Sequence, residues 1–329
     1  MVSLGARYFS AIDMTTFAFV FPGQGSQSVG MLDAWGDHPV VRDTLAEASV
    51  ALGQDLGALI HAGPKEELAL TTNTQPVMLV AAVAAYRVWR GEGGAAPAFV
   101  AGHSLGEYSA LVASGVLSLA QAVPLVRLRA QAMQEAVPVG TGAMAAVLGL
   151  ASDKVHAICQ EAQDSFGSGS AEVVQAANFN DPGQTVISGS KAGVDKACEM
   201  LKAAGAKRTL PLPVSAPFHC ALMKPAAERL RVALTSVDFH PPTIPLVNNI
   251  DVASPSSADD IRDALYRQAF GPVRWVEVIR AMQQRGVTHV VECGPGKVLA
   301  GMTPRIDASL QASPLYDPAT LAQVQALLS

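Results

Sequence analysis

Ser104 is the residue whose context most clearly indicates chemistry, because it lies at the centre of Gly-His-Ser-Leu-Gly at positions 102–106. In a Gly-x-Ser-x-Gly motif, a sharp turn between a strand and a helix holds the serine hydroxyl out above a sheet. The apolar residues 98–101 predict that strand, and residues 105–114 have the pattern of the helix. The motif therefore predicts a nucleophile that works through a covalent acyl-serine.

A serine hydroxyl needs a base to remove its proton, and seven histidines are available. His103 is adjacent to Ser104, but neighbouring side chains in such a turn point apart. His219 lies on a proline-bounded loop where the chain returns from a distinct middle section. His219 is therefore the predicted base. Ordinary helix, loop or strand-edge positions hold the other five, which are His38, His61, His156, His240 and His289.

The negative charge that develops in acyl transfer requires two N–H donors aimed at it. The amide of Leu105, directly after the nucleophile, is the first candidate. The second should come from a tight loop after another strand, and Gly23-Gln24-Gly25 follows the apolar segment 16–21. We therefore expect the Gln24 amide to be the second donor. A dinucleotide-binding loop is excluded by spacing, because Ser28 stands where its third glycine belongs.

Arg129 occupies an unusual place in the helix predicted over residues 119–137. At 100° per residue it lies beside Ala122, Leu125 and Met133, at the edge of the apolar face. A guanidinium there needs an anionic partner. Two interpretations stay open: an internal salt bridge or a side chain that reaches out to solvent, and a pair with a substrate carboxylate.

The order of elements predicts an α/β fold with a mostly parallel sheet. Helices are expected at residues 40–52 and 75–89, the second behind a Thr-Asn-Thr cap at 72–74. The pattern between residues 140 and 211 is β-α-β-β-α-β, with a turn at 180–183, which is the order of a ferredoxin-like unit. We expect a large α/β catalytic domain of residues 14–139 and 212–329, an inserted ferredoxin-like subdomain of residues 140–211, and an extension of residues 1–13.

Composition excludes several classes of function. Half of the 329 residues are apolar and the net charge is −5, which argues against general nucleic-acid binding. No segment approaches the roughly 20 apolar residues of a membrane helix. No His, Cys and acidic cluster has metal-ligand spacing. We therefore expect no membrane partner and no permanently bound metal or cofactor. We also expect a cytoplasmic protein, because its four separated cysteines fit reduced thiols: Cys159, Cys198, Cys220 and Cys293.

A series of ordered motifs resembles the malonyl-CoA:acyl-carrier-protein transacylases of fatty-acid synthesis and the acyltransferase domains of polyketide synthases. The match extends from residue 14 to about residue 306. Its landmarks are FPGQGSQ at 21–27, TQP at 74–76, GHSLGEY at 102–108, Arg129, GTGAM at 140–144, NDPGQ at 180–184, SAPFH at 215–219, Asn248-Asn249 and GPGKVL at 294–299.

The resemblance implies a hydrolase-like large domain and a role for each catalytic residue. Ser104 would carry a malonyl ester, and His219 would act as general acid and base. The backbone carbonyl of Gln268 would orient the His219 ring, in place of a carboxylate. Gln24 and Leu105 would form the oxyanion hole.

The resemblance also implies the substrates. Malonyl-CoA would be the donor, and the phosphopantetheine thiol of acyl carrier protein the acceptor. Arg129 would pair with the free malonyl carboxylate, and Gln75 would help to bind the substrate. In related polyketide domains, phenylalanine before the histidine accompanies malonyl and serine accompanies methylmalonyl. Phe218 therefore indicates malonyl.

Two other functions use the same residues. A serine hydrolase such as a lipase or thioesterase shares the Ser–His pair, although its histidine is usually near the C-terminus. A non-catalytic scaffold could keep the fold for partner binding, but it has no need for Ser104, His219 and Arg129 together.

Overall fold

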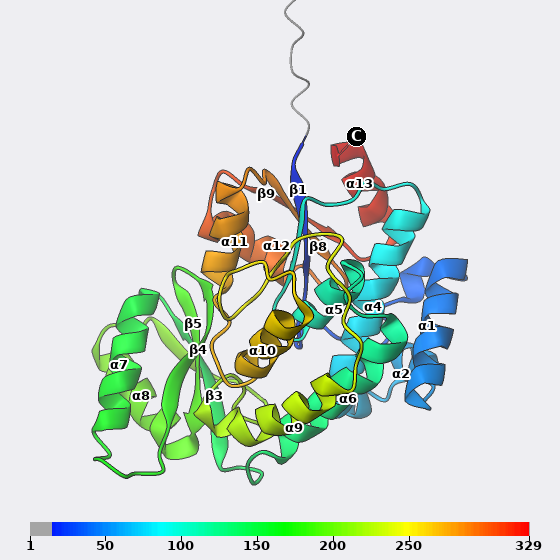
Figure 1. The fold of residues 1–329 in the computed structure, drawn as a ribbon. Helices are drawn as coiled ribbons and strands as arrows, with labels where there is room; N and C mark the ends of the chain where they lie inside the picture. The colour runs from blue at the N-terminus through cyan, green and yellow to red at the C-terminus, as the bar shows by residue number, and fades with distance from the viewer. Residues whose placement is uncertain (1–14, 329) are drawn as a thin grey trace, which may run out of the picture.

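The computed structural model describes residues 15–328, which form two β-sheets flanked by helices (Figure 1). The five-stranded sheet is parallel throughout, which confirms the predicted α/β class. The extension predicted for residues 1–13 lies outside the described residues. The strand order of the parallel sheet is β7 (Leu246–Val247), β2 (Phe99–Gly102), β1 (Phe17–Phe21), β8 (His289–Cys293) and β9 (Gln311–Leu315).

The central strand β1 is buried along its whole length because it separates two apolar cores. Phe17, Phe19 and Phe21 pack into one core and Ala18 and Val20 into the other, as the two-residue period of a strand requires. Helices cover both faces, so neither needs polar residues.

The first of these cores holds most of the helices, and the second holds two. Ser118 caps the helix α6 (Leu119–Glu135) with a complete capping box, as the sequence predicts. On the first core lie α1 (Pro39–Leu52), α2 (Leu56–Ala62), α3 (Lys65–Ala69), α4 (Thr71–Gly91), α5 (Gly106–Ala113), α6 (Leu119–Glu135), α9 (Lys224–Thr235), α10 (Ala258–Gln268) and α13 (Pro318–Leu328), and on the second α11 (Trp275–Gln284) and α12 (Val298–Ile306).

The second sheet is antiparallel and lies beside the first (green in Figure 1). Two helices, α7 (Ser152–Asp164) and α8 (Lys191–Ala203), share an apolar core with it. This arrangement is the ferredoxin-like order that the sequence predicts. The strands lie in the order β4 (Val174–Asp181), β5 (Gln184–Ser190), β3 (Gly142–Leu148) and β6 (Arg208–Pro211).

Strand β4 joins the two parts of the molecule. The amide of Phe179 donates to the Val273 carbonyl at 2.9 Å, and the amide of Val273 donates to the Ala177 carbonyl at 2.8 Å. The buried carboxylate of Asp181 pairs with Arg305 of α12 at 2.8 Å. The end of β4 is therefore fixed against the parallel-sheet layer, next to the Ser104 turn.

Some local predictions are wrong. Helix α4 begins at Thr71, so the Thr-Asn-Thr sequence lies inside it. Asn73 and Thr74 instead donate from their side chains to the carbonyls of Glu67 and Leu68. The turn expected at 180–183 is confined to residues 182 and 183, because β4 continues through Asp181.

Within residues 15–328, no helix combines the length and apolar character needed to cross a membrane. All four cysteines are free thiols, and three of them are buried.

Two glycines permit the turn at Ser104. A β-carbon on Gly102 would lie 1.9 Å from the backbone of Gly106, and one on Gly106 would lie 2.0 Å from the Phe21 carbonyl oxygen. Real β-carbons never approach backbone atoms so closely. The two glycines therefore let α5 pack directly on the ends of β1 and β2.

We expect Gly106→Ala to lower the free energy of unfolding by at least about 1–3 kcal/mol, because the added methyl group has only backbone to displace. Gly301→Ala is the matched control, since Gly301 lies in α12 with open space around its β-carbon position. That change should be neutral or stabilise by about 0.5–1 kcal/mol. Urea unfolding measures both, and equal stabilities for the two variants would contradict this account.

Candidate active site

The nucleophile turn places Ser104 between β2 and α5 with a positive φ of 53°. This conformation costs free energy for a residue with a β-carbon, so the surroundings must stabilise it. Asn249 does so with both ends of its amide. Its Oδ1 accepts from the Ser104 amide at 2.7 Å, and its Nδ2 donates to the Gly102 carbonyl at 2.7 Å. Asn249 therefore holds the turn in place.

His219 reaches the nucleophile directly. Its Nε2 lies 2.6 Å from Ser104 Oγ, and its Nδ1 lies 3.0 Å from the Gln268 carbonyl and 3.2 Å from the Gly271 carbonyl. Carbonyl oxygens only accept, so Nδ1 carries the proton and Nε2 is free to accept from the serine hydroxyl. The structure thus brings the predicted base and its predicted carbonyl partner together.

The environment keeps His219 neutral. Burial, followed by the positive charge of Arg129, lowers the pKa of His219 from the ordinary 6.5 to about 3. The ring is therefore in its basic form at neutral pH. In the unfolded chain, the same histidine binds its proton at higher pH. The neutral His219 therefore contributes fully to the free energy of unfolding above about pH 6.5, and this contribution declines as pH falls toward 3.

Arg129 is buried beside the nucleophile, with only 2% of its surface exposed. Its guanidinium donates to Gln75 Oε1 at 2.8 Å, Ser104 Oγ at 3.1 Å and Gln268 Oε1 at 3.1 Å. Its Nε is buried and finds no acceptor among the residues that the structure describes.

The surroundings of Arg129 rule out both parts of its first interpretation. A side chain that reaches solvent is wrong because the guanidinium is buried, and the internal salt bridge is wrong because no carboxylate in residues 15–328 lies within 4.0 Å. A buried guanidinium with neutral partners retains capacity for an anion.

Gln268 contacts the whole site through its side chain as well as its carbonyl. It is fully buried, and its Nε2 donates to the Ser104 carbonyl at 3.0 Å and to Glu107 Oε2 at 3.1 Å. Its Oε1 accepts from Arg129, as described above. One residue therefore links nucleophile, base and guanidinium.

The two amides predicted as oxyanion donors lie at the same cavity as Ser104. A β-carbon on Gly23 would lie 2.7 Å from the His103 carbonyl oxygen, so the loop that carries Gln24 packs against the nucleophile turn. Leu105 precedes the first residue of α5, where amides lack helical partners. Neither amide donates to another group of the described chain. Both therefore remain free for an oxyanion.

The cavity at Ser104 has a volume of about 540 Å³, which is large enough for an acyl group and part of a thioester arm. Arg129, Gln75 and His219 line it, and Phe218, Met133 and Met144 form apolar parts of the wall.

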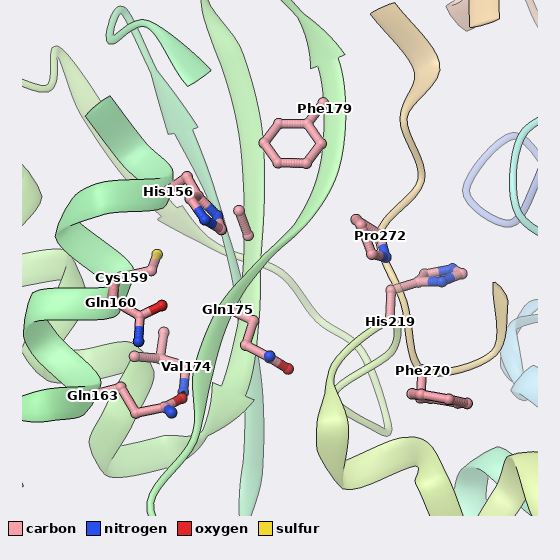
Figure 2. Close-up of a pocket in the computed structure, with 11 residues that line it drawn as sticks. His156, Cys159, Gln160, Gln163, Val174, Gln175, Phe179, His219, Phe270 and Pro272 are labelled. Atoms are coloured by element: carbon pink, nitrogen blue, oxygen red, sulfur yellow. The ribbon is translucent and has the colours of Figure 1, made fainter. Parts of the chain in front are cut away.

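A second cavity, of about 160 Å³, lies between α7, β4 and the loop after α10. Figure 2 shows the His219 ring directed away from His156 and Gln175 of this cavity. Ser104 and Arg129 do not line it. His219 therefore lines both cavities, whereas Ser104 and Arg129 line only the larger one.

Comparison with known proteins agrees with this geometry. The family described as acyl transferase domain matches residues 18–306. The chain belongs to the acyl transferase family. The malonyl CoA-acyl carrier protein transacylase of Escherichia coli K12 is 56% identical over 310 residues, which cover 94% of this chain and 98% of that protein. The transacylase of Bacillus subtilis is 43% identical over 309 residues, covering 94% and 96%.

Solved acyl transferases have the same fold. The acyl-carrier-protein S-malonyltransferase of Burkholderia pseudomallei is 61% identical, with a TM-score of 0.92 over 95% of this chain and 100% of that chain. A malonyl-transacylase in complex with a type II PKS acyl-carrier protein is 50% identical, with a TM-score of 0.91 over 95% and 100%.

Two polar residues of this acyl transferase site were not predicted as such. Asn249 follows β7 at the carboxyl edge of the parallel sheet, where side chains of neighbouring strands meet, and this position is the signal that could have identified it. Glu107 is the second residue of the buried helix α5, close after the nucleophile turn, and a carboxylate in such an apolar segment is a comparable signal. His103 lines the same cavity, but its Nε2 lies 2.8 Å from Asn180 Oδ1 and so is engaged there.

We expect the His219 ring to remain uncharged between about pH 8 and pH 5, because its pKa is lowered to about 3. NMR of the histidine ring signals measures this, with His219→Gln to assign the resonance. Exposed His61 is the internal control, since its hydrogen bond to Asp33 raises its pKa above 6.5. A His219 signal that titrates near 6.5 would contradict the buried, neutral base.

Proposed function

We infer that this protein is a malonyl-CoA:acyl-carrier-protein transacylase, which transfers a malonyl group to the phosphopantetheine thiol of acyl carrier protein for fatty-acid elongation. One observation carries the choice of substrate. A charged Arg129 is buried next to Ser104 Oγ, without a carboxylate partner in the described chain. Malonyl-CoA supplies the carboxylate that this position lacks, whereas a simple acyl ester does not.

The first half-reaction begins when His219 Nε2 takes the proton of Ser104 Oγ as the oxygen attacks the thioester carbonyl. The amides of Gln24 and Leu105 stabilise the resulting oxyanion. The Ser104 amide is excluded from this role, because it already donates to Asn249. Collapse of the intermediate expels CoA, which receives the proton from His219, and leaves malonyl-Ser104.

The second half-reaction reverses these roles. The phosphopantetheine thiol of acyl carrier protein gives its proton to His219 and attacks the malonyl ester, and Ser104 leaves with the proton. Backbone carbonyls of Gln268 and Gly271, and no carboxylate, orient the His219 ring. We propose that this weaker support keeps the base moderate, so that a thiol is activated and water is not.

Three side chains would select the malonyl group. Arg129 pairs with its carboxylate through the guanidinium group that lies 3.1 Å from Ser104 Oγ. Gln75 holds the guanidinium from the other side at 2.8 Å. Phe218, in the cavity wall next to His219, would crowd an α-methyl substituent.

The division of the chain and its location belong to the same proposal. All strands of the antiparallel sheet lie within residues 140–211, which supports an inserted subdomain between residues 14–139 and 212–329 of a large catalytic domain. Four free cysteines fit a reducing compartment, which supports the cytoplasm.

Mixing the protein with malonyl-CoA without an acceptor should produce one malonyl adduct, which intact-protein mass spectrometry detects. Ser104→Ala should abolish it. Ser109→Ala is the matched control, because Ser109 is a buried serine one turn along α5 and lies outside the cavity.

Arg129→Gln should reduce malonyl transfer by at least about 100-fold, the order expected for a lost charged hydrogen bond, and should spare acetyl transfer.

Other outcomes separate the alternatives. Continuous release of malonate without acceptor would identify a hydrolase. Equal loss of malonyl and acetyl transfer in Arg129→Gln would show that the arginine supports the fold only. Absence of any adduct on the wild-type protein would refute the transferase.

A further inference from the structure

The proposed reaction leaves one buried acid near the nucleophile without a role. Glu107 is the second residue of α5, and only 1% of its surface is exposed. Its Oε2 accepts from the Asn249 amide at 2.9 Å and from Gln268 Nε2 at 3.1 Å. A buried carboxylate is costly unless hydrogen bonds and an opposite charge compensate it. We therefore expect a positively charged group close to the Glu107 carboxylate.

The amide of Gln268 connects Glu107 to Arg129. Oε1 accepts from the guanidinium at 3.1 Å, while Nε2 donates to the carboxylate at 3.1 Å. The amide dipole thus points its negative end at the cation and its positive end at the anion. The reverse orientation would set the amide NH₂ group against a guanidinium, which only donates. The hydrogen-bond pattern therefore fixes the order Arg129, Gln268, Glu107.

Neither Glu107 nor Arg129 has an oppositely charged partner in direct contact among the described residues. Neither side chain forms a salt bridge within the described residues, so the two are separated by a single neutral amide. Burial, the largest influence, raises the pKa of Glu107 to about 7 and lowers that of Arg129. Their mutual attraction opposes burial in both, because it lowers the pKa of Glu107 and raises that of Arg129. Each group thus favours the charged form of the other.

We propose that Glu107 is the resident counter-charge of Arg129, which holds the guanidinium beside Ser104 through the Gln268 amide when no substrate carboxylate is present. Glu107 is then a positioning residue for malonyl recognition. This inference rests on the proposed function, in which Arg129 receives the malonyl carboxylate. It has a consequence that a purely structural role lacks. A bound malonyl group brings its own negative charge, so the charge of Glu107 should matter most in the free enzyme.

Glu107→Gln tests this, because it keeps the size and an acceptor oxygen but removes the charge. At about pH 8, above the pKa of about 7, the wild-type group is ionised. We expect the Tm of the free variant to fall by about 4 °C or more. In the malonyl-Ser104 form, at least half of that loss should disappear. In an Arg129→Gln background, the same change should shift Tm by less than about 1 °C.

Glu292→Gln is the matched control. Glu292 is also fully buried, its pKa is also raised to about 7, and its Oε2 accepts from the Ala300 amide at 2.8 Å. No arginine is among the groups that shift its pKa. Its loss in Tm should be the same with and without the malonyl group, and in both Arg129 backgrounds.

The remaining outcomes also decide the question. Equal losses for Glu107→Gln in all three states would overturn the counter-charge. If Glu107→Gln does not fold, the Glu107→Gln, Arg129→Gln double variant should fold, and its failure to do so would overturn the inference too. The comparison in the Arg129→Gln background does not require a malonyl group on Ser104. If the wild-type protein forms no malonyl adduct, the proposed function fails, and the coupling between the two charges is still tested.

Discussion

The structure depends on a buried positive charge placed beside a nucleophile. The guanidinium of Arg129 is removed from water and donates to Ser104, Gln75 and Gln268, none of which carries a charge. Burial lowers the pKa of His219 most and the charge of Arg129 lowers it further, so the base stays neutral. The same charge favours a substrate that brings a carboxylate. One electrostatic constraint thus links base strength to substrate choice.

The fold brings these groups together from distant parts of the chain. Parallel strands β1 and β2 end next to each other, so the Gln24 loop and the Ser104 turn meet at one edge of the sheet. Asn249 comes from the end of β7, and Gln268 from the end of α10. Strand β4 adds Asn180 from the antiparallel sheet, where it holds His103. The strained turn at Ser104 is therefore stabilised from several directions.

Local patterns in the sequence identified the groups that react. The glycines around Ser104 and the proline-bounded loop of His219 are local signals, and Arg129 stands out against the apolar face of its own helix. The partners of Arg129 could not be derived this way, because Gln75 and Gln268 come from separate helices and only packing decides what they contact. Asn249 and Glu107 each carry a local signal, but only the packing shows that they contact the Ser104 turn and Gln268. The Thr-Asn-Thr cap failed because tertiary contacts to Glu67 and Leu68 replaced it.

A crystal structure of the wild-type protein after exposure to malonyl-CoA, without an acceptor, tests the central claim most directly. The account predicts a malonyl ester on Ser104 Oγ, its carboxylate against the Arg129 guanidinium, and its carbonyl oxygen at the amides of Gln24 and Leu105. An ester on another residue, or a malonyl carboxylate directed into solvent with Arg129 still bound only to neutral groups, would contradict it.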